Sequence, residues 1–362
     1  MAFLILLIKI IVVFQIIMGL ASFCTWVERK GSALLQDRIG ANRAGAFFET
    51  RNIFLKPIFW VIRWLGILGI INTLLCDAVK AVLKEDFVPK GVSNFMHSLA
   101  PFMATMPVFL AFAVVPFAPN FTLFGYEITT QIAPLNAGVL FVLAMGSITV
   151  YGVIVAGWVS NNKFSLLGAL RASAQMISYE LAMGVALATV LVVYGTLDLY
   201  KIVEAQKVHW GIWSHPTGWL TFIILFVVGM AETKRGPFDL PESESELVAG
   251  YFTEYSGMKF LLFWLGEFAE IALFSVIITL FFFGGWNFPG LDLSGGTWQE
   301  ALLGHIILMT KVVIFCVLQI VIRWTLPRFR YDQLMALGWK MLLPISFVDI
   351  MVTSWLKLKG WF

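Results

Sequence analysis

The densest cluster of ionisable residues in the chain lies in the segment 232–257, called the acidic segment below. Six of the 22 acidic residues fall there, although 59% of the chain is hydrophobic. They are Glu232, Asp239, Glu242, Glu244, Glu246 and Glu254. Carboxyl groups gathered in apolar surroundings raise one another's pKa and favour proton sharing. The acidic segment therefore predicts proton handling, with a helix cap or a surface that docks another subunit as alternatives.

Part of the acidic segment has the pattern of a helix start. The four residues from Asp239 to Glu242 supply a cap residue, a proline in the first turn and an acid near the positive end of the helix dipole. On a continuous helix Glu242 and Glu246 lie one turn apart, and Glu254 continues their row, while Glu244 points elsewhere. A cap explains one or two of these carboxylates, and the row predicts a further role for the others.

Four ionisable residues lie inside long apolar segments: Glu180, Glu267, Glu270 and Lys311. A charge at the bilayer centre costs about 2.5 to 3.5 kcal/mol on insertion scales, so such residues face a bundle interior or water. The structural alternative is a buried ion pair, for instance Lys311 with Glu270 or Asp349. Glu180 and Glu267 lie in the same half of the membrane as the acidic segment, which favours a role in proton movement.

The composition excludes an ordinary soluble domain. The mean hydropathy is +0.86 and only 13% of the residues are charged, whereas apolar runs reach the roughly 20 residues that cross a bilayer as a helix. We therefore expect an all-α, polytopic membrane protein that forms a single membrane domain over residues 1–362. About eight spans are predicted, at Leu4–Trp26, Phe95–Phe117, Leu135–Val159, Ala172–Leu197, Gly218–Ala231, Phe260–Phe283, His305–Trp324 and Leu334–Leu356.

The distribution of basic residues gives the orientation. With these spans, 19 of the 25 Lys and Arg residues fall on one side, in the segments 27–94, 160–171, 232–259 and 323–340. By the positive-inside rule this side is cytoplasmic, so both termini face the periplasm. Within segment 27–94 an apolar stripe predicts interfacial or folded-back helices over Ile53–Lys84. Two further spans forming a tight hairpin are the alternative.

The predicted fifth span, Gly218–Ala231, is unusually short. If it crosses the membrane, Glu232 and the residues after it begin below the headgroup level. Non-helical backbone at that depth, which Gly236-Pro237 predicts, persists only where it is buried in protein or lines a wet cavity. We expect the acidic segment to form part of a cavity wall.

The chain has few residues that could hold a redox centre or a nucleotide. Its three cysteines form no Cys-x-x-Cys pair, its four histidines are far apart, and it has no glycine-rich nucleotide fingerprint. We expect no metal site, flavin or iron–sulfur cluster in this chain, so any redox centre nearby belongs to another polypeptide.

Several motifs in order resemble the NADH dehydrogenase subunit 1 family, whose members are membrane components of proton-pumping NADH:quinone oxidoreductases. They are Glu28-Arg29-Lys30, the run from Gln36 to Arg43, Asp77-Ala78-Val79-Lys80, the run from Lys84 to Pro89, the run from Ser165 to Glu180, the run from Glu232 to Tyr251, and the run from Glu254 to Phe260. The resemblance covers essentially the whole chain. This chain departs from the family at three positions. Ala41 stands where the family usually has Pro, Lys234 where it has Asn, and Gly236 where it has Ala or Thr. The segment between Gly45 and Asp77 is also longer and more apolar than expected, and the third span carries no acid.

The resemblance implies a membrane subunit of a respiratory complex in a bacterial inner membrane, with quinone as the substrate. Its partners would be the lipid bilayer and other subunits, including one that carries the cluster next to the quinone, with no nucleic acid. Matching positions imply a quinone chamber bordered by Arg29, Asp77, Ala78, Lys80, Glu232, Arg235 and Phe238. They imply a charged path through Glu242, Glu244, Glu246 and Glu254, which Glu180 and Glu267 carry into the membrane.

Three other functions fit parts of the pattern. A related energy-converting complex with another electron donor, such as a hydrogenase, would use a homologous membrane subunit. An independent ion channel or transporter is favoured by inverted repeats of broken helices, and no convincing repeat is present. In a purely structural anchor, the acids would serve only to dock a soluble arm.

Overall fold

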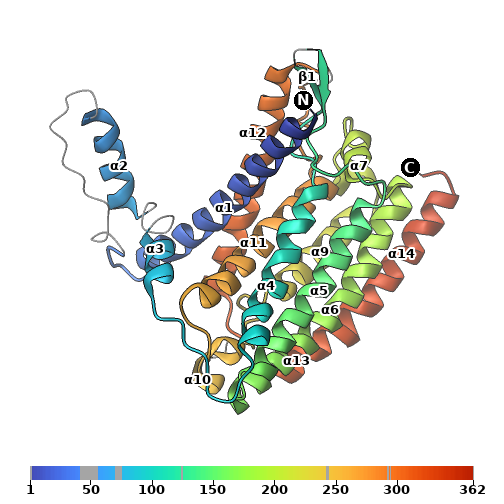
Figure 1. Cartoon of the computed structure of the whole chain (residues 1–362). Helices are drawn as coiled ribbons and strands as arrows, with labels where there is room; N and C mark the ends of the chain where they lie inside the picture. The colour runs from blue at the N-terminus through green and yellow to red at the C-terminus, as the bar shows by residue number, and fades with distance from the viewer. Residues whose placement is uncertain are drawn as a thin grey trace.

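The computed structural model describes residues 2–40, 56–69, 76–123, 125–241, 244–291, 293 and 295–361. Helices dominate these residues, as the sequence predicts for an all-α membrane protein (Figure 1). The only strands in these ranges are β1 (Phe121–Leu123) and β2 (Tyr126–Ile128). They form an antiparallel hairpin in which Phe121 lies opposite Ile128.

Seven helical segments of the described chain are long and apolar enough to cross a membrane. They are α1 (Ala2–Leu35), α4 (Asn94–Ala111), α5 (Gly138–Val159), α6 (Lys163–Tyr194), α11 (Gly257–Phe282), α12 (Trp298–Thr325) and a last segment made of α13 (Tyr331–Ala336), η4 (Leu337–Leu342) and α14 (Leu343–Leu358). An eighth helix, α9 (Gly218–Glu232), has 15 residues and matches the predicted short span. The polytopic all-α architecture is confirmed, with seven candidate spans and α9 as a shorter apolar helix at the position of the predicted fifth span.

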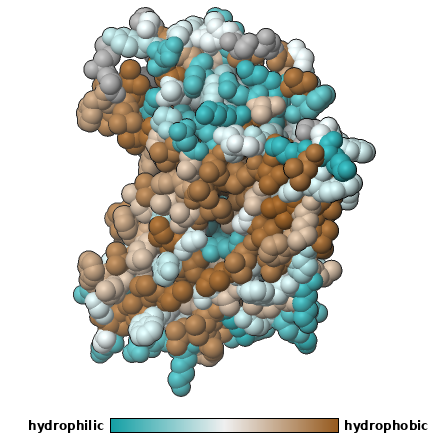
Figure 2. Space-filling view, turned by 90° about the vertical axis from the view of Figure 1, so that its right-hand side faces the viewer, coloured by the Kyte–Doolittle hydropathy of each residue, from teal (hydrophilic) through white to brown (hydrophobic). Residues whose placement is uncertain are grey.

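The surface and the chain ends agree with a multi-pass membrane protein. Hydrophobic side chains form a broad brown band between hydrophilic ends (Figure 2). The two termini lie toward the same end of the bundle, near β1, α7 (Leu199–Ala205) and α8 (Gly211–Ser214), and opposite α10 (Glu244–Leu247) and α13 (Figure 1). This arrangement follows from an even number of crossings.

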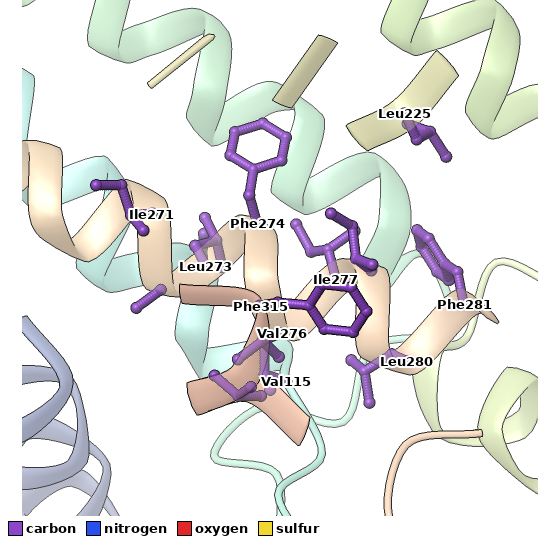
Figure 3. Packing of buried hydrophobic residues seen from close by; sticks show 14 of the residues in the cluster. Val115, Leu225, Ile271, Leu273, Phe274, Val276, Ile277, Leu280, Phe281 and Phe315 are labelled. Atoms are coloured by element: carbon purple, nitrogen blue, oxygen red, sulfur yellow. The ribbon is translucent and has the colours of Figure 1, made fainter. Parts of the chain in front are cut away.

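Helix α11 forms the centre of the bundle. Its sequence is hydrophobic on every side, which is typical of a helix that is surrounded by others, and 78% of its most apolar stretch is buried. Leu273, Phe274 and Val276 point from α11 in different directions toward its neighbours (Figure 3). Because α1, α4, α9 and α12 all pack against α11, a polar residue on α11 meets several elements at once.

Helices α4 and α5 lie in close contact. A Cβ atom at Gly152 of α5 would overlap the backbone of Ala104 on α4. Small residues allow such close approach of membrane helices, whose association depends on van der Waals packing. The 3-10 turn η2 (Phe112–Val114) ends α4 and leads to the β-hairpin.

The described part of segment 27–94 contains two short helices, α2 (Lys56–Leu68) and α3 (Asp77–Leu83). With 13 and 7 residues, they are shorter than a bilayer span. Helix α2 stands apart from the bundle, with Trp60 and Trp64 exposed (Figure 1), whereas α3 packs against α11. Residues 71–75 of the predicted apolar stripe lie outside the described residues, and an interfacial position for these helices stays a prediction.

Candidate functional site

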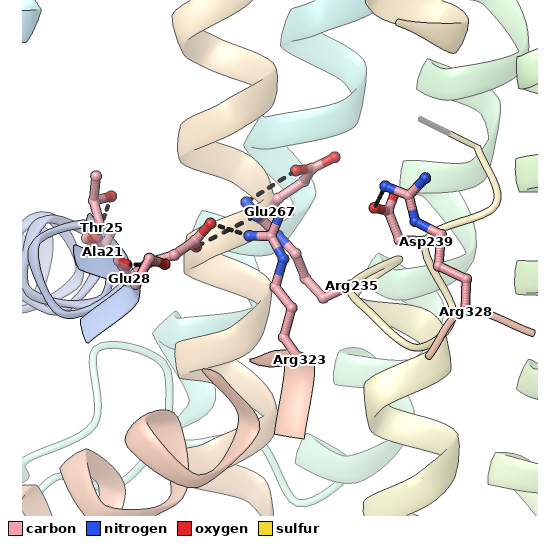
Figure 4. A network of polar contacts seen from close by, with 9 residues as sticks. Ala21, Thr25, Glu28, Arg235, Asp239, Glu267, Arg323 and Arg328 are labelled. Atoms are coloured by element: carbon pink, nitrogen blue, oxygen red, sulfur yellow. Dashed lines mark hydrogen bonds and ion pairs between the residues drawn. The ribbon is translucent and has the colours of Figure 1, made fainter. Parts of the chain in front are cut away.

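A buried ion network joins three transmembrane helices through Arg235. Its guanidinium Nη1 lies 3.4 Å from Glu28 Oε2 on α1, and its Nη2 lies 3.3 Å from Glu267 Oε2 on α11. Arg323, near the end of α12, also pairs with Glu28 (Figure 4). Arg235 is only 7% exposed, and buried charges of this kind need paired partners. The network therefore holds α1, α11 and α12 together at the level where α9 ends.

The loop that carries Arg235 is non-helical and buried, as the short fifth span predicts. Its backbone polar groups find partners in the protein. The Gln175 side chain donates hydrogen bonds to the carbonyls of Ala231 and Phe238, and the Phe329 amide donates to the Pro237 carbonyl. Such pairing lets irregular backbone persist at membrane depth.

Asp239 extends the network beyond Arg235 in the same loop. Its carboxylate accepts a hydrogen bond of 2.8 Å from Arg328 (Figure 4). Burial raises the pKa of Asp239 to about 6, and the nearby guanidinium groups of Arg328 and Arg235 limit the rise. The carboxyl group thus changes charge near neutral pH. Helix α10 begins only at Glu244, so Asp239 does not serve as the predicted helix cap.

Glu267, a predicted member of the proton path, has a second partner. The Tyr251 hydroxyl donates a hydrogen bond of 2.8 Å to its Oε1. On the other side, the Arg235 guanidinium lies 4.4 Å from the ring centre of Phe268, within the range of a cation–π interaction. Glu267 is therefore fixed between the loop and the 3-10 turn η3 (Gly250–Phe252).

A second buried cluster lies beside this network. Glu232 ends α9, and Lys234 Nζ lies 3.7 Å from Glu270 Oε2 on α11. Glu232 and Glu270 both line a cavity of about 40 Å³, together with Thr149 of α5 and apolar residues. Glu180 on α6 lies within electrostatic range of Glu232. The predicted intramembrane acids therefore gather on one side of α11.

A larger cavity of about 460 Å³ lies between α1, α3 and the start of α11. Arg29 Nη1 lies 2.6 Å from Asp77 Oδ2, and the guanidinium is 5.2 Å from the ring centre of Trp264. Lys80 and Tyr255 also line this cavity. Burial raises the pKa of the Tyr255 phenol, which keeps its proton at neutral pH. The cavity thus offers aromatic walls and cationic groups, a combination that suits an apolar ligand with a polar head.

The seven residues predicted to border the quinone chamber lie at several different sites in the structure. Arg29, Asp77 and Lys80 line the large cavity. Ala78 is half-buried on α3 and is not among its lining residues. Glu232 lies at the small cavity and Arg235 in the ion network. Phe238 is buried between Tyr179 and Phe329, with ring centres 5.8 and 5.4 Å away.

The predicted carboxylate row on a continuous helix is wrong. Helix α10 ends after four residues, because the backbone turns left-handed at Val248 (φ 67°) and again at Gly250 (φ 54°). Glu246 pairs with Arg171 at 2.6 Å, and Glu254 accepts a hydrogen bond of 2.7 Å from Asn162. Both therefore lie against the N-terminal part of α6. Glu242 and the side chain of Glu244 lie outside the described residues.

The alternative of a buried ion pair between Lys311 and Glu270 or Asp349 is not found in the described residues. Lys311 Nζ donates to the carbonyls of Phe283, Gly285 and Asn287, at 2.7 to 2.9 Å. Asp349 instead accepts a hydrogen bond of 2.6 Å from Thr221. Lys311 thus satisfies carbonyl groups at the C-terminal end of α11, as basic side chains often do.

Several network residues were not assigned a role from the sequence. Glu28 was noted only within a motif, and Arg323 and Arg328 were counted only as basic residues of the cytoplasmic side. Glu28 lies 295 residues from Arg323 along the chain, so no local spacing could have indicated the pair. The only signal was that Glu28 lies at the end of a long apolar run. No group of three or more candidate metal ligands occurs among the described residues.

The fold and the buried charges define a class of protein: a polytopic helical membrane protein with a charged network beside an amphiphilic cavity. A family model described as NADH dehydrogenase matches residues 8–354. The chain belongs to this family.

Close relatives carry a consistent description, since each is named as a subunit of an NADH-quinone oxidoreductase. The relative from Geobacter metallireducens is 44% identical over 348 residues, which cover 96% of this chain and 95% of the relative. The one from Cytophaga hutchinsonii is 42% identical, with coverage of 94% and 93%. The one from Leptospira biflexa is also 42% identical, with coverage of 98% and 96%.

Proposed function

We propose that this chain is the quinone-binding membrane subunit of a proton-translocating NADH:quinone oxidoreductase in a bacterial inner membrane. In this proposal the large cavity receives the quinone head, and the buried carboxyl groups couple quinone reduction to proton movement. Other subunits of the complex supply NADH oxidation and the iron–sulfur cluster that passes electrons to the quinone.

One observation carries the proposal: a single turn of α1 borders both the cavity and the network. Arg29 lines the cavity beside Asp77, and the preceding residue, Glu28, pairs with Arg235. A change of charge in the cavity therefore acts on the network across one residue of a helix. Charges interact more strongly in a medium less polar than water than they do in solvent.

Quinone reduction supplies that change of charge. A quinone becomes a quinol by accepting two electrons and two protons. It carries negative charge whenever an electron arrives before the proton that neutralises it. Arg29 and Lys80 are placed to attract the developing negative charge on the quinone oxygens. An Arg29 drawn toward the quinone weakens its hold on Asp77.

The ion network has two acceptors for one guanidinium. Arg235 lies at nearly equal distances from Glu28 and Glu267. A shift of Arg235 toward Glu28 would leave Glu267 with Tyr251 alone, which favours uptake of a proton there. Such an exchange has two discrete states, with Arg235 paired either to Glu28 or to Glu267, and contacts with two discrete states can transmit conformational change.

The proposal is tested with Glu267→Gln in the assembled complex, after assembly has been checked on a native gel. NADH:quinone turnover and proton pumping are both expected to fall, because the variant cannot exchange a proton at this position. Glu127→Gln at the exposed hairpin is the matched control. Normal turnover and pumping in the assembled Glu267→Gln complex would overturn the coupling role. Assembly loss without any change in turnover per complex would favour the structural anchor.

The electron donor is tested separately. With NADH as the donor, the purified complex is expected to reduce a soluble quinone, and reduction with hydrogen or another donor in place of NADH would favour the homologous subunit of a related complex.

A further inference from the structure

A buried lysine lies next to the two carboxyl groups of the small cavity. Lys234 is 5% exposed and Glu270 is 6% exposed, and their charged atoms are 3.7 Å apart. Glu232, two residues before Lys234, lines the same cavity as Glu270. One cation and two carboxyl groups therefore share a site that solvent does not reach directly.

The backbone does not explain a lysine at this position. Lys234 follows the end of α9 with φ of 54°, a conformation that glycine and asparagine adopt more readily than lysine. The side chain does explain it, because the ammonium group reaches Glu270 and lies 6.0 Å from the ring centre of Tyr251. The position therefore places a positive charge beside Glu270, one of the two carboxyl groups that line the cavity.

The two carboxyl groups have different surroundings. Both oxygens of Glu232 are buried and make no hydrogen bond within the described part of the chain, whereas Glu270 faces the ammonium group. The cavity of about 40 Å³ exceeds the roughly 10 to 15 Å³ that one water molecule requires. A water molecule between the two carboxyl groups would give Glu232 a route for its proton.

Other charged groups surround the pair on several elements. Glu180 approaches from α6, Arg235 belongs to the same loop as Lys234, and Glu267 lies one turn from Glu270 on α11. Arg235 is already shared between Glu28 and Glu267, which leaves Lys234 as the nearest cation to Glu270 in the described structure. Two carboxyl groups that face one cavity resist simultaneous ionisation, so a single neighbouring cation decides which one keeps its charge.

We propose that Lys234 is a positioning residue that holds Glu270 as a carboxylate, so that Glu232 is the group that takes up and releases the proton. The step moves one proton between Glu232 and water, while Glu270 stays charged and paired. This inference rests on the proposed function, because it assigns a role within the same proton path.

The test uses the whole complex in proteoliposomes. Lys234→Asn removes the charge and suits the left-handed backbone, and Lys234→Arg keeps the charge as the matched control. Lys234→Asn is expected to lower the number of protons moved per electron by about twofold or more, because both carboxyl groups then compete for the proton. The added Glu270→Gln substitution is expected to restore much of that ratio, because it removes the unpaired carboxylate.

Infrared difference spectra of the same complexes separate this role from a structural one. The unsubstituted protein is expected to show a protonated-carboxyl band that disappears in Glu232→Gln. Lys234→Asn should add a second band that Glu270→Gln removes, whereas Lys234→Arg should not. If Lys234→Asn assembles poorly, the double variant with Glu270→Gln still tests the proposal, since the Glu232 band must remain in it.

Two outcomes are distinguishable. Unchanged pumping and an unchanged infrared spectrum in Lys234→Asn would overturn the role of Lys234 alone. Unchanged pumping and turnover in both Glu232→Gln and Glu267→Gln would instead overturn the proposed proton path itself.

Discussion

Glu28 and Arg29 are neighbours on α1, yet their charged groups belong to two different sites. The Arg29 guanidinium lies 2.6 Å from Asp77 at the large cavity, and the Glu28 carboxylate lies 3.4 Å from Arg235 in the ion network. Successive residues of a helix point about 100° apart, which allows one turn to form the wall between the two sites. Residues of this wall are the first targets for substitution.

The first prediction concerns Arg29. Arg29→Gln is expected to raise the KM for quinone by about tenfold, because the loss of a charged hydrogen-bond donor to a polar ligand group costs on the order of 1.5 kcal/mol. Turnover at saturating quinone should fall less. Steady-state kinetics with a soluble quinone analogue measure both quantities.

Lys90→Gln provides the matched control for this substitution. Lys90 is exposed in the same segment 27–94 and is not among the residues that line the cavity. An equal increase in KM in both variants would show that the effect is a general loss of positive charge, and would contradict a specific role for Arg29.

Much of this fold follows from the sequence because the bilayer imposes a simple rule. Apolar runs of sufficient length must become helices, and even the unusually short α9 was predicted on that basis. Glu267 and Glu180 were also found from the sequence, since a charge in an apolar run is costly and signals a buried partner or water.

The site was harder to predict because it depends on contacts between distant segments. Arg235 and Glu28 are 207 residues apart, and an arginine at the end of a span has the same sequence pattern whether it anchors the chain or forms a buried pair. The break of α10 was missed because a valine with positive φ has no sequence signature. Local helical spacing therefore suggested a carboxylate row that does not exist.

The second prediction concerns the pH dependence of stability. The pKa of Asp239 is about 6 in the folded protein, above the ordinary value near 3.9 that an unfolded chain shows. The folded state therefore binds the proton more tightly, and this contribution to stability is present below about pH 4 and is lost as the pH rises through 6. Asp239→Asn stays neutral at every pH.

Thermal unfolding of the purified complex between pH 4 and 8 tests this prediction. The melting temperature of Asp239→Asn minus that of the unsubstituted protein should rise by about a few degrees from pH 4 to pH 7. Asp332→Asn is a suitable control, because Asp332 is exposed. A difference that stays constant across this range would contradict the raised pKa.

The third prediction concerns the contact between α4 and α5. Gly152→Ala is expected to destabilise the protein by about 1 to 3 kcal/mol, because an overpacked contact forces the backbone apart. Gly184→Ala on α6 is the matched control, since a Cβ there meets no atom within 4 Å. The yield of assembled complex and its thermal stability measure the effect. Equal behaviour of the two alanine variants would contradict the close packing of α4 on α5.

The last prediction is that Lys311 stabilises the fold and takes no part in the proton path. Lys311→Met leaves the carbonyls of Phe283, Gly285 and Asn287 without their common donor, and a buried acceptor without a partner costs about 1 to 3 kcal/mol. The variant should therefore assemble less well and unfold at a lower temperature. Its turnover and pumping per assembled complex should stay normal, because Lys311 does not contact the carboxyl groups around α11 that we assign to the path.

Lys201→Met is the control for this substitution, because Lys201 lies at the same end of the bundle with a side chain that is 61% exposed. It removes the same charge without removing a buried donor, so its stability should change little. A Lys311→Met complex of normal stability with reduced pumping would reverse the assignment. Lys311 would then act on protons rather than on the end of α11, and the path would have to extend toward the end of the bundle where the two termini lie.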